Sequence, residues 1–302
     1  MPWRTSMSLP TFENVLLERT GADDRIGVLT LNRPEKMNAL SQELIYDFRD
    51  ACEHFEADDD VRVIIVKGAG RTFSAGYDLT PAGGYGADAI HRRFRTVDDD
   101  GNRLIMGIRG GMARVTDIWL YFWNMQKVTI AQLHGYAIAG GFELSMMADL
   151  VVAAEDTQIG HPGLRFAGSR TSAILPLLTN MRKAKELFYT GDPIRATEAA
   201  ELNLINYAVP RDELEEKTMA LAERVANLPA DHLAQLKVHM NRFYENMGIY
   251  SSLRSSTDLD AVGTFTSQHY EWSRRMRDEG LKGALAWRDG PFGDYSQAPR
   301  NR

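Results

Sequence analysis

The sequence is poor in the residues that mark several large classes of protein. Cys52 is the only cysteine among 302 residues, which excludes an internal disulfide framework and a zinc site built from cysteines. No run approaches the roughly 18 consecutive apolar residues that a membrane-spanning helix needs. Residues 1–7 contain no apolar segment of the kind found in secretory signals. We therefore expect a cytoplasmic protein that does not enter membranes.

Positive charge is also scarce, with 35 Lys and Arg against 41 Asp and Glu, a formal net charge of -6. Nucleic-acid binders usually carry a basic surface, so we expect no nucleic-acid partner. The chain has no Gly-x-Ser-x-Gly nucleophile elbow and no complete dinucleotide-binding glycine pattern. Its histidines lack the spacing of metal ligands. We expect neither a metal nor a bound cofactor.

What the chain does contain is an alternation of strand and helix patterns. Ser41 is a plausible N-cap, and the helix after it has apolar residues at helical spacing, namely Leu44, Phe48, Cys52 and Phe55. We interpret Cys52 as a small hydrophobe of this helix in preference to a reactive thiol. Short β-branched runs predict strands at 14–19, 25–31, 61–67, 128–133 and 150–154. Strands alternating with helices predict an α/β fold.

The second half of the chain is mostly helical, with clear patterns at 196–202, 212–226 and 231–246. We expect a core over residues 12–210, a helical region over 211–292 that serves assembly, and a frayed tail over 293–302.

One internal stretch departs from the regular alternation. Residues 81–117 combine two glycines, a basic cluster and an acidic run, and we interpret them as an enlarged loop or helical excursion in preference to a binding lid. The aromatic run at 118–123 is expected in the core or at a subunit interface.

Two strand exits are rich in small residues, at 71–79 and 134–144. Small residues let the backbone approach a ligand closely. Gly140 and Gly141 begin a helix, where backbone N–H groups lack partners and favour negative charge. Two such N–H groups converging on one oxygen form an oxyanion hole. Each exit alone is equally compatible with an ordinary tight turn.

Taken together and in this order, the motifs resemble those of the enoyl-CoA hydratase/isomerase (crotonase) family. The most specific stretch runs from His134-Gly135-Tyr136-Ala137 through Gly140-Gly141-Phe142-Glu143-Leu144 to Ala148-Asp149, and Phe73-Ser74-Ala75-Gly76-Tyr77-Asp78-Leu79 precedes it. The resemblance covers residues 12–292. It implies a spiral of ββα units with a helical C-terminal trimerisation region, and assembly as a homotrimer or a hexamer of two trimers.

The resemblance also implies an acyl thioester of coenzyme A as the substrate, so that CoA enters as part of the substrate. The backbone N–H groups of Tyr77 and Gly140 would then stabilise a thioester enolate. Asp149 matches a family position that we interpret as structural. Positions matching the CoA and substrate channel are Met37, Ala39, Leu40, Ala75, Asp78, Leu79 and Gly141, and Lys237 resembles a late basic residue that faces CoA phosphates.

The hydratases of this family use two glutamates around one water. Glu143 matches the first, and the second is replaced by Gly163 in the segment Gly160-His161-Pro162-Gly163. Two-carboxylate acid–base chemistry cannot run unchanged without it. His161 is a candidate replacement because histidine titrates near neutral pH. Arg165 is a candidate for binding a second carboxylate on the acyl group.

Three functions remain open at this point. A hydratase, lyase or isomerase would use Glu143 as base or water activator. A hydrolase, decarboxylase or carbon–carbon bond-cleaving enzyme needs the oxyanion hole but not both glutamates. A non-catalytic acyl-CoA binding protein would need neither. The long stretch 81–117 and the aromatic run after it lead us to expect an enlarged acyl site.

Overall fold

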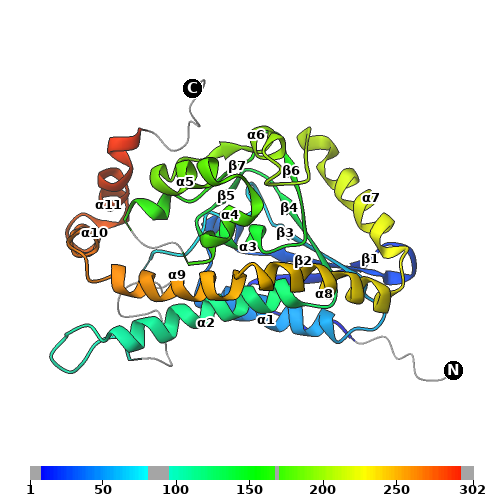
Figure 1. The fold of residues 1–302 in the computed structure, drawn as a ribbon, viewed down its shortest axis with the longest axis horizontal. Coiled ribbons are helices and arrows are strands. Elements are labelled where there is room, and N and C mark those ends of the chain that lie inside the picture. The colour runs from blue at the N-terminus through cyan, green and yellow to red at the C-terminus, as the bar shows by residue number, and fades with distance from the viewer. Residues whose placement is uncertain (1–7, 81–94, 167–169, 294–302) are drawn as a thin grey trace.

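The computed structural model describes residues 8–80, 95–166 and 170–293. Residues 81–94, which belong to the stretch expected to be enlarged, and nearly all of the expected tail lie outside the described residues. The fold is mixed α/β, as the alternation predicted, with a helical C-terminal part (Figure 1).

Most strands form one sheet of six, in the order β1-β2-β3-β4-β6-β9, and a smaller sheet has the order β5-β7-β8. In the large sheet β1 and β2 are antiparallel, and the remaining neighbours are parallel. The strands are β1 (Val15–Thr20), β2 (Ile26–Leu31), β3 (Val63–Gly68), β4 (Val128–Leu133), β5 (Tyr136–Ile138), β6 (Leu150–Ala154), β7 (Gln158–Gly160), β8 (Ile194–Arg195) and β9 (Tyr207–Val209).

The helices cover both faces of the large sheet and extend beyond one end of it. They are α1 (Gln42–Glu56), α2 (Ile105–Asn124), α3 (Gly140–Met146), α4 (Leu175–Leu178), α5 (Met181–Thr190), α6 (Ala196–Glu201), α7 (Leu214–Ala226), α8 (Ala230–Asn246), α9 (Ile249–Gly263), α10 (Ser267–Asp278) and α11 (Gly280–Asp289).

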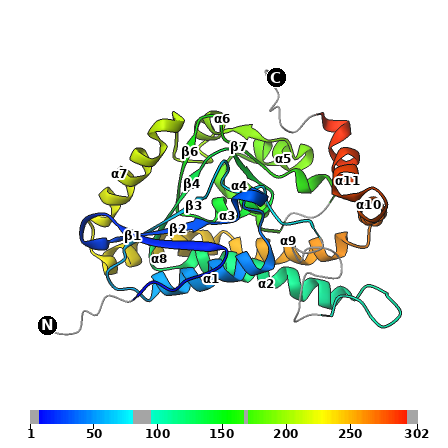
Figure 2. The same cartoon turned by 180° about the vertical axis from the view of Figure 1, so that it is seen from behind.

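The parallel strands are buried on both faces because their side chains alternate between two hydrophobic clusters. In β3, Val63 and Ile65 pack with α7, whereas Ile64 and Val66 pack in the larger cluster that includes α1 and α2. Figures 1 and 2 show α7 on one side of the sheet, α1 and α2 on the other, and α10 and α11 at the end farthest from β1.

Helix α1 forms as the sequence predicted. Ser41 Oγ accepts a hydrogen bond from the Leu44 backbone at 3.2 Å, which confirms the N-cap. Cys52 is fully buried in the core on this helix, and burial raises the pKa of its thiol well above the ordinary value. Cys52 therefore contributes packing and not a reactive thiolate.

Helix α2 joins two stretches that the sequence pattern kept apart. It begins inside the expected excursion and continues through the aromatic run, whose Ile118, Trp119 and Phe122 are buried in the core. The interpretation of the aromatic run as core is thus confirmed.

Candidate active site

Three predicted motifs meet where the parallel strands end. The backbone of Ser74 pairs with the segment after β4, donating to Tyr136 O at 2.9 Å and accepting from Ile138 N at 3.2 Å. On its other side, Leu40 N donates to Gly76 O at 2.8 Å. Since carboxyl ends of parallel strands lie at one edge of a sheet, residues distant in sequence are brought side by side here.

The two segments approach so closely that only small residues fit between them. Gly76 has φ +92°, and a Cβ on it would lie 2.7 Å from Ala139 Cβ and 3.2 Å from Gly140 N. Ala139, the N-cap of α3, is itself held at φ 50°. Left-handed alanine is uncommon and costs free energy, so surrounding structure must enforce it. The backbones of Tyr77 and Gly140, the two residues predicted for the oxyanion hole, are therefore neighbours.

Glu143 lies one turn into α3, and its side chain is only 1% exposed. Its two carboxylate oxygens have different partners. Tyr77 Oη donates a short hydrogen bond to Oε2, and His161 Nε2 lies 3.0 Å from Oε1. Trp119 Nε1 in turn donates to Tyr77 Oη at 3.3 Å. The result is a hydrogen-bonded chain from Trp119 through Tyr77 and Glu143 to His161.

His161 fills the space beside the position where the second glutamate is missing. A Cβ on Gly163 would lie 2.8 Å from His161 Cε1 and 3.1 Å from Nδ1. Within the described part of the chain, the buried Nδ1 has no hydrogen-bond partner. A carboxylate oxygen only accepts hydrogen bonds, so the 3.0 Å contact with Glu143 places a ring proton on Nε2.

A cavity of about 1210 Å³ opens beside this chain. Several residues predicted for catalysis or the CoA channel line it, and they are Met37, Ala39, Ala75, Tyr77, Asp78, Leu79, Glu143 and His161. Leu40, Gly140 and Gly141 are buried behind the lining. A Cβ on Gly140 would lie 2.9 Å from both Leu40 and the Tyr77 ring, so glycine is needed there for close packing.

Asp78 holds the loop that carries Tyr77. Its carboxylate accepts hydrogen bonds from Thr80 Oγ1 at 2.6 Å and from Arg33 at 3.0 Å. Burial alone would raise the pKa of Asp78, but the hydrogen bonds from Thr80 and the Arg33 cation outweigh it and lower the pKa. Asp78 is therefore ionised at neutral pH and fixes the backbone on the far side of Tyr77.

Lys237 lies in α8 away from the cavity wall, and its predicted role at the CoA phosphates is corrected. It is buried, and its Nζ donates to Asp149 Oδ2 at 2.6 Å and to Lys127 O at 3.0 Å. Asp149 also accepts from Thr129 N at 2.7 Å, in line with its structural interpretation. Lys237 ties α8 to the sheet because its buried ammonium group needs the half-buried Asp149 carboxylate as a partner.

The prediction for Arg165 is corrected in the same way. Its side chain is 2% exposed and binds Asp192 at 2.7 Å and Asp289 at 3.0 Å, while Nε donates to Thr190 O at 2.8 Å. The guanidinium is thus committed to its own chain and is not part of the cavity lining.

Sequence reasoning missed the far wall of the cavity. It is formed by Phe166 and by side chains of α10 and α11, among them His269, Trp272, Leu281 and Leu285. Their spacing at i, i+3 and i+4 is a helical stripe, which looks the same whether it faces a core or a cavity. Lys36 and Arg71, exposed basic residues of the lining, were also missed.

No group of three metal-binding side chains was found among the described residues. The same residues contain no helix long and apolar enough to cross a bilayer.

Comparison with known proteins identifies the family. A family model described as enoyl-CoA hydratase/isomerase matches residues 21–107 and 111–281. The chain belongs to this family. It is 35% identical to EchA13 of Mycobacterium tuberculosis, named as an enoyl-CoA hydratase, over 96% of this chain and 91% of that protein. It is 30% identical to the crotonyl-CoA hydratase of Syntrophomonas wolfei over 83% of this chain and 88% of that protein.

Solved structures agree with the expected crotonase fold. An enoyl-CoA hydratase from Mycobacterium smegmatis has a TM-score of 0.85 at 29% identity, covering 96% of this chain and 98% of the other. An enoyl-CoA hydratase/isomerase from Xanthobacter autotrophicus Py2 has a TM-score of 0.82 at 30% identity, covering 94% of this chain and 100% of the other. Family and fold membership confirm the resemblance seen in the motifs and imply an acyl-CoA substrate.

Proposed function

We propose that this protein hydrates an enoyl-CoA thioester, with Glu143 as the group that activates water. The observation that carries the proposal is the buried Glu143 carboxylate at the cavity wall, held by Tyr77 and His161. The thioester carbonyl would lie against the backbone N–H groups of Tyr77 and Gly140. Those dipoles stabilise the enolate that forms when water adds to the β-carbon.

The missing carboxylate at position 163 requires another route for the second proton. The oxygen of water bonds to the β-carbon while Glu143 takes a proton from that water. A group at the cavity must then deliver a proton to the α-carbon of the enolate. His161 with its proton on Nε2 cannot accept one back from Glu143 there, because that nitrogen then has no lone pair.

The Tyr77 hydroxyl meets this requirement, because a phenol oxygen both donates and accepts. Tyr77 Oη would give its proton to the α-carbon and recover one from Glu143 along the hydrogen bond that joins them. Every group is then returned to its starting state, and one water has been added across the double bond. His161 holds the other oxygen of Glu143 and positions its carboxylate.

The CoA portion would leave the cavity past the segments that match the family's CoA channel. Lys36 directly precedes Met37, Arg71 directly precedes Thr72, whose carbonyl accepts from Asn38 Nδ2, and both basic residues are exposed in the lining. We assign to them the attraction of CoA phosphates that the sequence had suggested for Lys237. A few basic side chains suffice for an anionic ligand despite the acidic balance of the chain.

A second function is favoured by one observation, the absence of a carboxylate at Gly163. A hydrolase, decarboxylase or carbon–carbon bond-cleaving enzyme would use the same oxyanion hole with one carboxylate. Such an enzyme would bind CoA thioesters without hydrating enoyl-CoA.

The test follows the loss of enoyl-thioester absorbance with crotonyl-CoA and with 2-octenoyl-CoA. We expect hydration of at least one ester, and a fall in kcat of at least about a hundredfold in Glu143→Gln with retained thioester binding. Glu155→Gln is the matched control because Glu155 is exposed and does not line the cavity. Near-normal turnover by Glu143→Gln would exclude the proposed mechanism, and binding without hydration would favour the second function.

A further inference from the structure

The far wall of the cavity, formed by Phe166 and side chains of α10 and α11, indicates which acyl groups the site can bind. It begins next to the catalytic residues, since Phe166 follows the turn that contains Gly163 and donates from its backbone to Gly163 O at 3.1 Å. A thioester oriented as in the proposed function, with CoA toward Met37 and Leu79, would send its acyl group toward this wall. The inference below rests on that orientation.

Aromatic rings form part of this wall. The rings of Phe166 and Trp272 are stacked at 4.2 Å between centroids with planes 25° apart. The His269 ring lies on Phe166 at 6.3 Å and 26°. Three stacked rings from two distant segments thus line the cavity together.

Apolar side chains at helical spacing extend this surface along α10 and α11. Trp272 and Met276 stand four residues apart on α10, and Leu281 and Leu285 stand four apart on α11. Residues four apart lie on one face of a helix, so each helix turns an apolar stripe toward the cavity. Met112 of α2 adds to the same lining.

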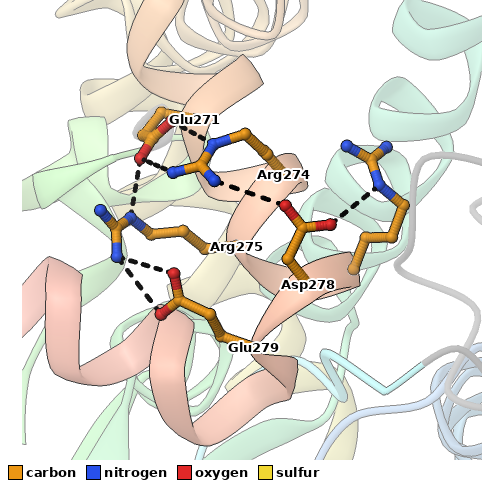
Figure 3. A network of polar contacts seen from close by, with 6 residues as sticks. Glu271, Arg274, Arg275, Asp278 and Glu279 are labelled. Atoms are coloured by element: carbon orange, nitrogen blue, oxygen red, sulfur yellow. Dashed lines mark hydrogen bonds and ion pairs between the residues drawn. The ribbon is translucent and has the colours of Figure 1, made fainter.

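The arginine side chains of this wall already have hydrogen-bond or ion-pair partners within the chain. Arg288 binds Asp289 through two hydrogen bonds of 2.8 and 2.7 Å. Arg274 binds Glu271 and Asp278, and Arg277 binds the other oxygen of Asp278 (Figure 3).

The two remaining charged side chains of the wall are those of Arg103 and Asp260. Arg103 donates to Thr264 O and to Ser273 Oγ, and Asp260 is a buried carboxylate. Each of the four guanidinium groups of the wall, those of Arg103, Arg274, Arg277 and Arg288, thus has hydrogen-bond partners within the chain.

His269 adds no charge at neutral pH. Burial and the nearby Arg103 cation lower its pKa to about 4. A second carboxylate on the acyl group would therefore lose its hydration and meet only guanidinium groups that are already bonded within the chain. Arg165, the residue suggested by sequence for such a carboxylate, is bound to Asp192 and Asp289 instead.

We propose that the site selects a large, uncharged, apolar acyl group, which packs on the wall formed by Phe166, Trp272 and the apolar stripes of α10 and α11. The cavity of about 1210 Å³ includes both the side assigned to CoA and this apolar wall. A four-carbon acyl group would leave most of the apolar wall in contact with water.

Saturated CoA esters test this proposal independently of the reaction, because they bind but have no double bond to hydrate. Equilibrium binding is measured by calorimetry for butanoyl-CoA, octanoyl-CoA and 3-phenylpropanoyl-CoA. We expect the two larger esters to bind at least about tenfold more tightly than butanoyl-CoA, since each added carbon buries apolar surface. Glutaryl-CoA is compared with pentanoyl-CoA of equal chain length, and we expect it to bind at least about tenfold more weakly.

Variants then locate the effect on the wall. Trp272→Leu is expected to weaken the binding of octanoyl-CoA and 3-phenylpropanoyl-CoA about tenfold, while the affinity for butanoyl-CoA changes much less. Phe166→Leu serves as a second variant if Trp272→Leu does not fold. Trp287→Leu is the matched control, because Trp287 lies on α11 but does not line the cavity.

Equal affinity for butanoyl and octanoyl esters, or glutaryl-CoA binding as tightly as pentanoyl-CoA, would overturn the proposal. Neither result depends on hydration. If the protein hydrates enoyl-CoA but binds esters of all chain lengths equally, the proposed function stands and this inference fails. If it binds large apolar esters more tightly but hydrates no enoyl-CoA, this inference stands and the proposed function fails.

Discussion

The ring of His161 lies where a side chain on Gly163 would have to go, with only 2.8 Å between His161 Cε1 and the Cβ that any other residue would introduce. The two positions are therefore coupled. A glutamate at 163 would require the His161 ring to move from this position.

Gly163→Glu alone should destabilise the protein by about 1–3 kcal/mol, because an overpacked buried site must shift its neighbours. His161→Gln combined with Gly163→Glu should recover much of that loss, since the ring that causes the clash is gone. Chemical denaturation of both single variants and the double variant gives the coupling free energy. Additive effects would show that the two side chains do not compete for the same space.

Tyr77→Phe should lower kcat by about a hundredfold or more, because the proposed proton relay loses its hydroxyl. Trp119→Phe should lower kcat less, by about tenfold, with little change in KM, since Trp119 only orients the hydroxyl through its 3.3 Å hydrogen bond. Trp123→Phe is the control. Trp123 is buried one turn further along α2 and contacts Tyr250 instead. An equal loss of kcat in Trp123→Phe would assign the effect of Trp119 to packing.

Lys237→Met should lower the free energy of unfolding by about 3 kcal/mol, because it leaves the Asp149 carboxylate without its buried cation. The KM for CoA esters should stay within twofold of the wild-type value. Lys36→Ala and Arg71→Ala should each raise the KM for CoA esters and change the free energy of unfolding little. Steady-state kinetics and urea unfolding of the three variants separate these roles. A tenfold rise in KM for Lys237→Met with unchanged stability would show that Lys237 binds the CoA ester after all.

His269 should make stability sensitive to acid. Burial, with a smaller contribution from Arg103, lowers the pKa of His269 to about 4, from an ordinary value of 6.5. The unfolded chain therefore binds a proton at higher pH than the folded chain does. The contribution of His269 to the free energy of unfolding is fully present above about pH 6.5 and is lost as the pH falls toward 4.

In His269→Gln, the loss of unfolding free energy between pH 7 and pH 4.5 should be smaller by up to about 2 kcal/mol. Urea titrations at a series of pH values measure this difference. His232→Gln, at an exposed position on α8, is the control and should keep the wild-type acid sensitivity. If both variants lose stability with acid as the wild type does, His269 is not the responsible group.

The strands and α1 could be predicted because their signals are local. Runs such as 61–67 are short, β-branched and bounded by polar residues, and Ser41 lies directly before a helical stripe. Helix α2 was harder to see as one element, because Gly107, Gly110 and Gly111 lower helix propensity. The structure explains Gly107, since a Cβ there would lie 1.8 Å from Arg95 O. The glycine is retained for close packing and not for flexibility.

The site was predictable to the extent that it is built from contiguous motifs. Tyr77, Gly140 and Glu143 belong to such motifs, and their meeting follows from parallel strands that end at one edge. The partners of Lys237 and Arg165 lie 88 and 124 residues away in sequence, so no local pattern could show that these cations are already bound. The aromatic wall was hidden for a related reason, because Phe166 and Trp272 meet only through the placement of α10.

The contacts of Arg165 also bear on the order in which the site is completed during synthesis. Arg165 ends the turn that follows His161, and one of its two ion-pair partners, Asp289, lies at the end of α11. A ribosome must therefore extend the chain past α11 before this turn has both of its ion pairs. Glu143 and the first ion-pair partner, Asp192, lie earlier in the chain, so a chain cut short before α11 would lack the second ion pair of the turn beside the catalytic residues.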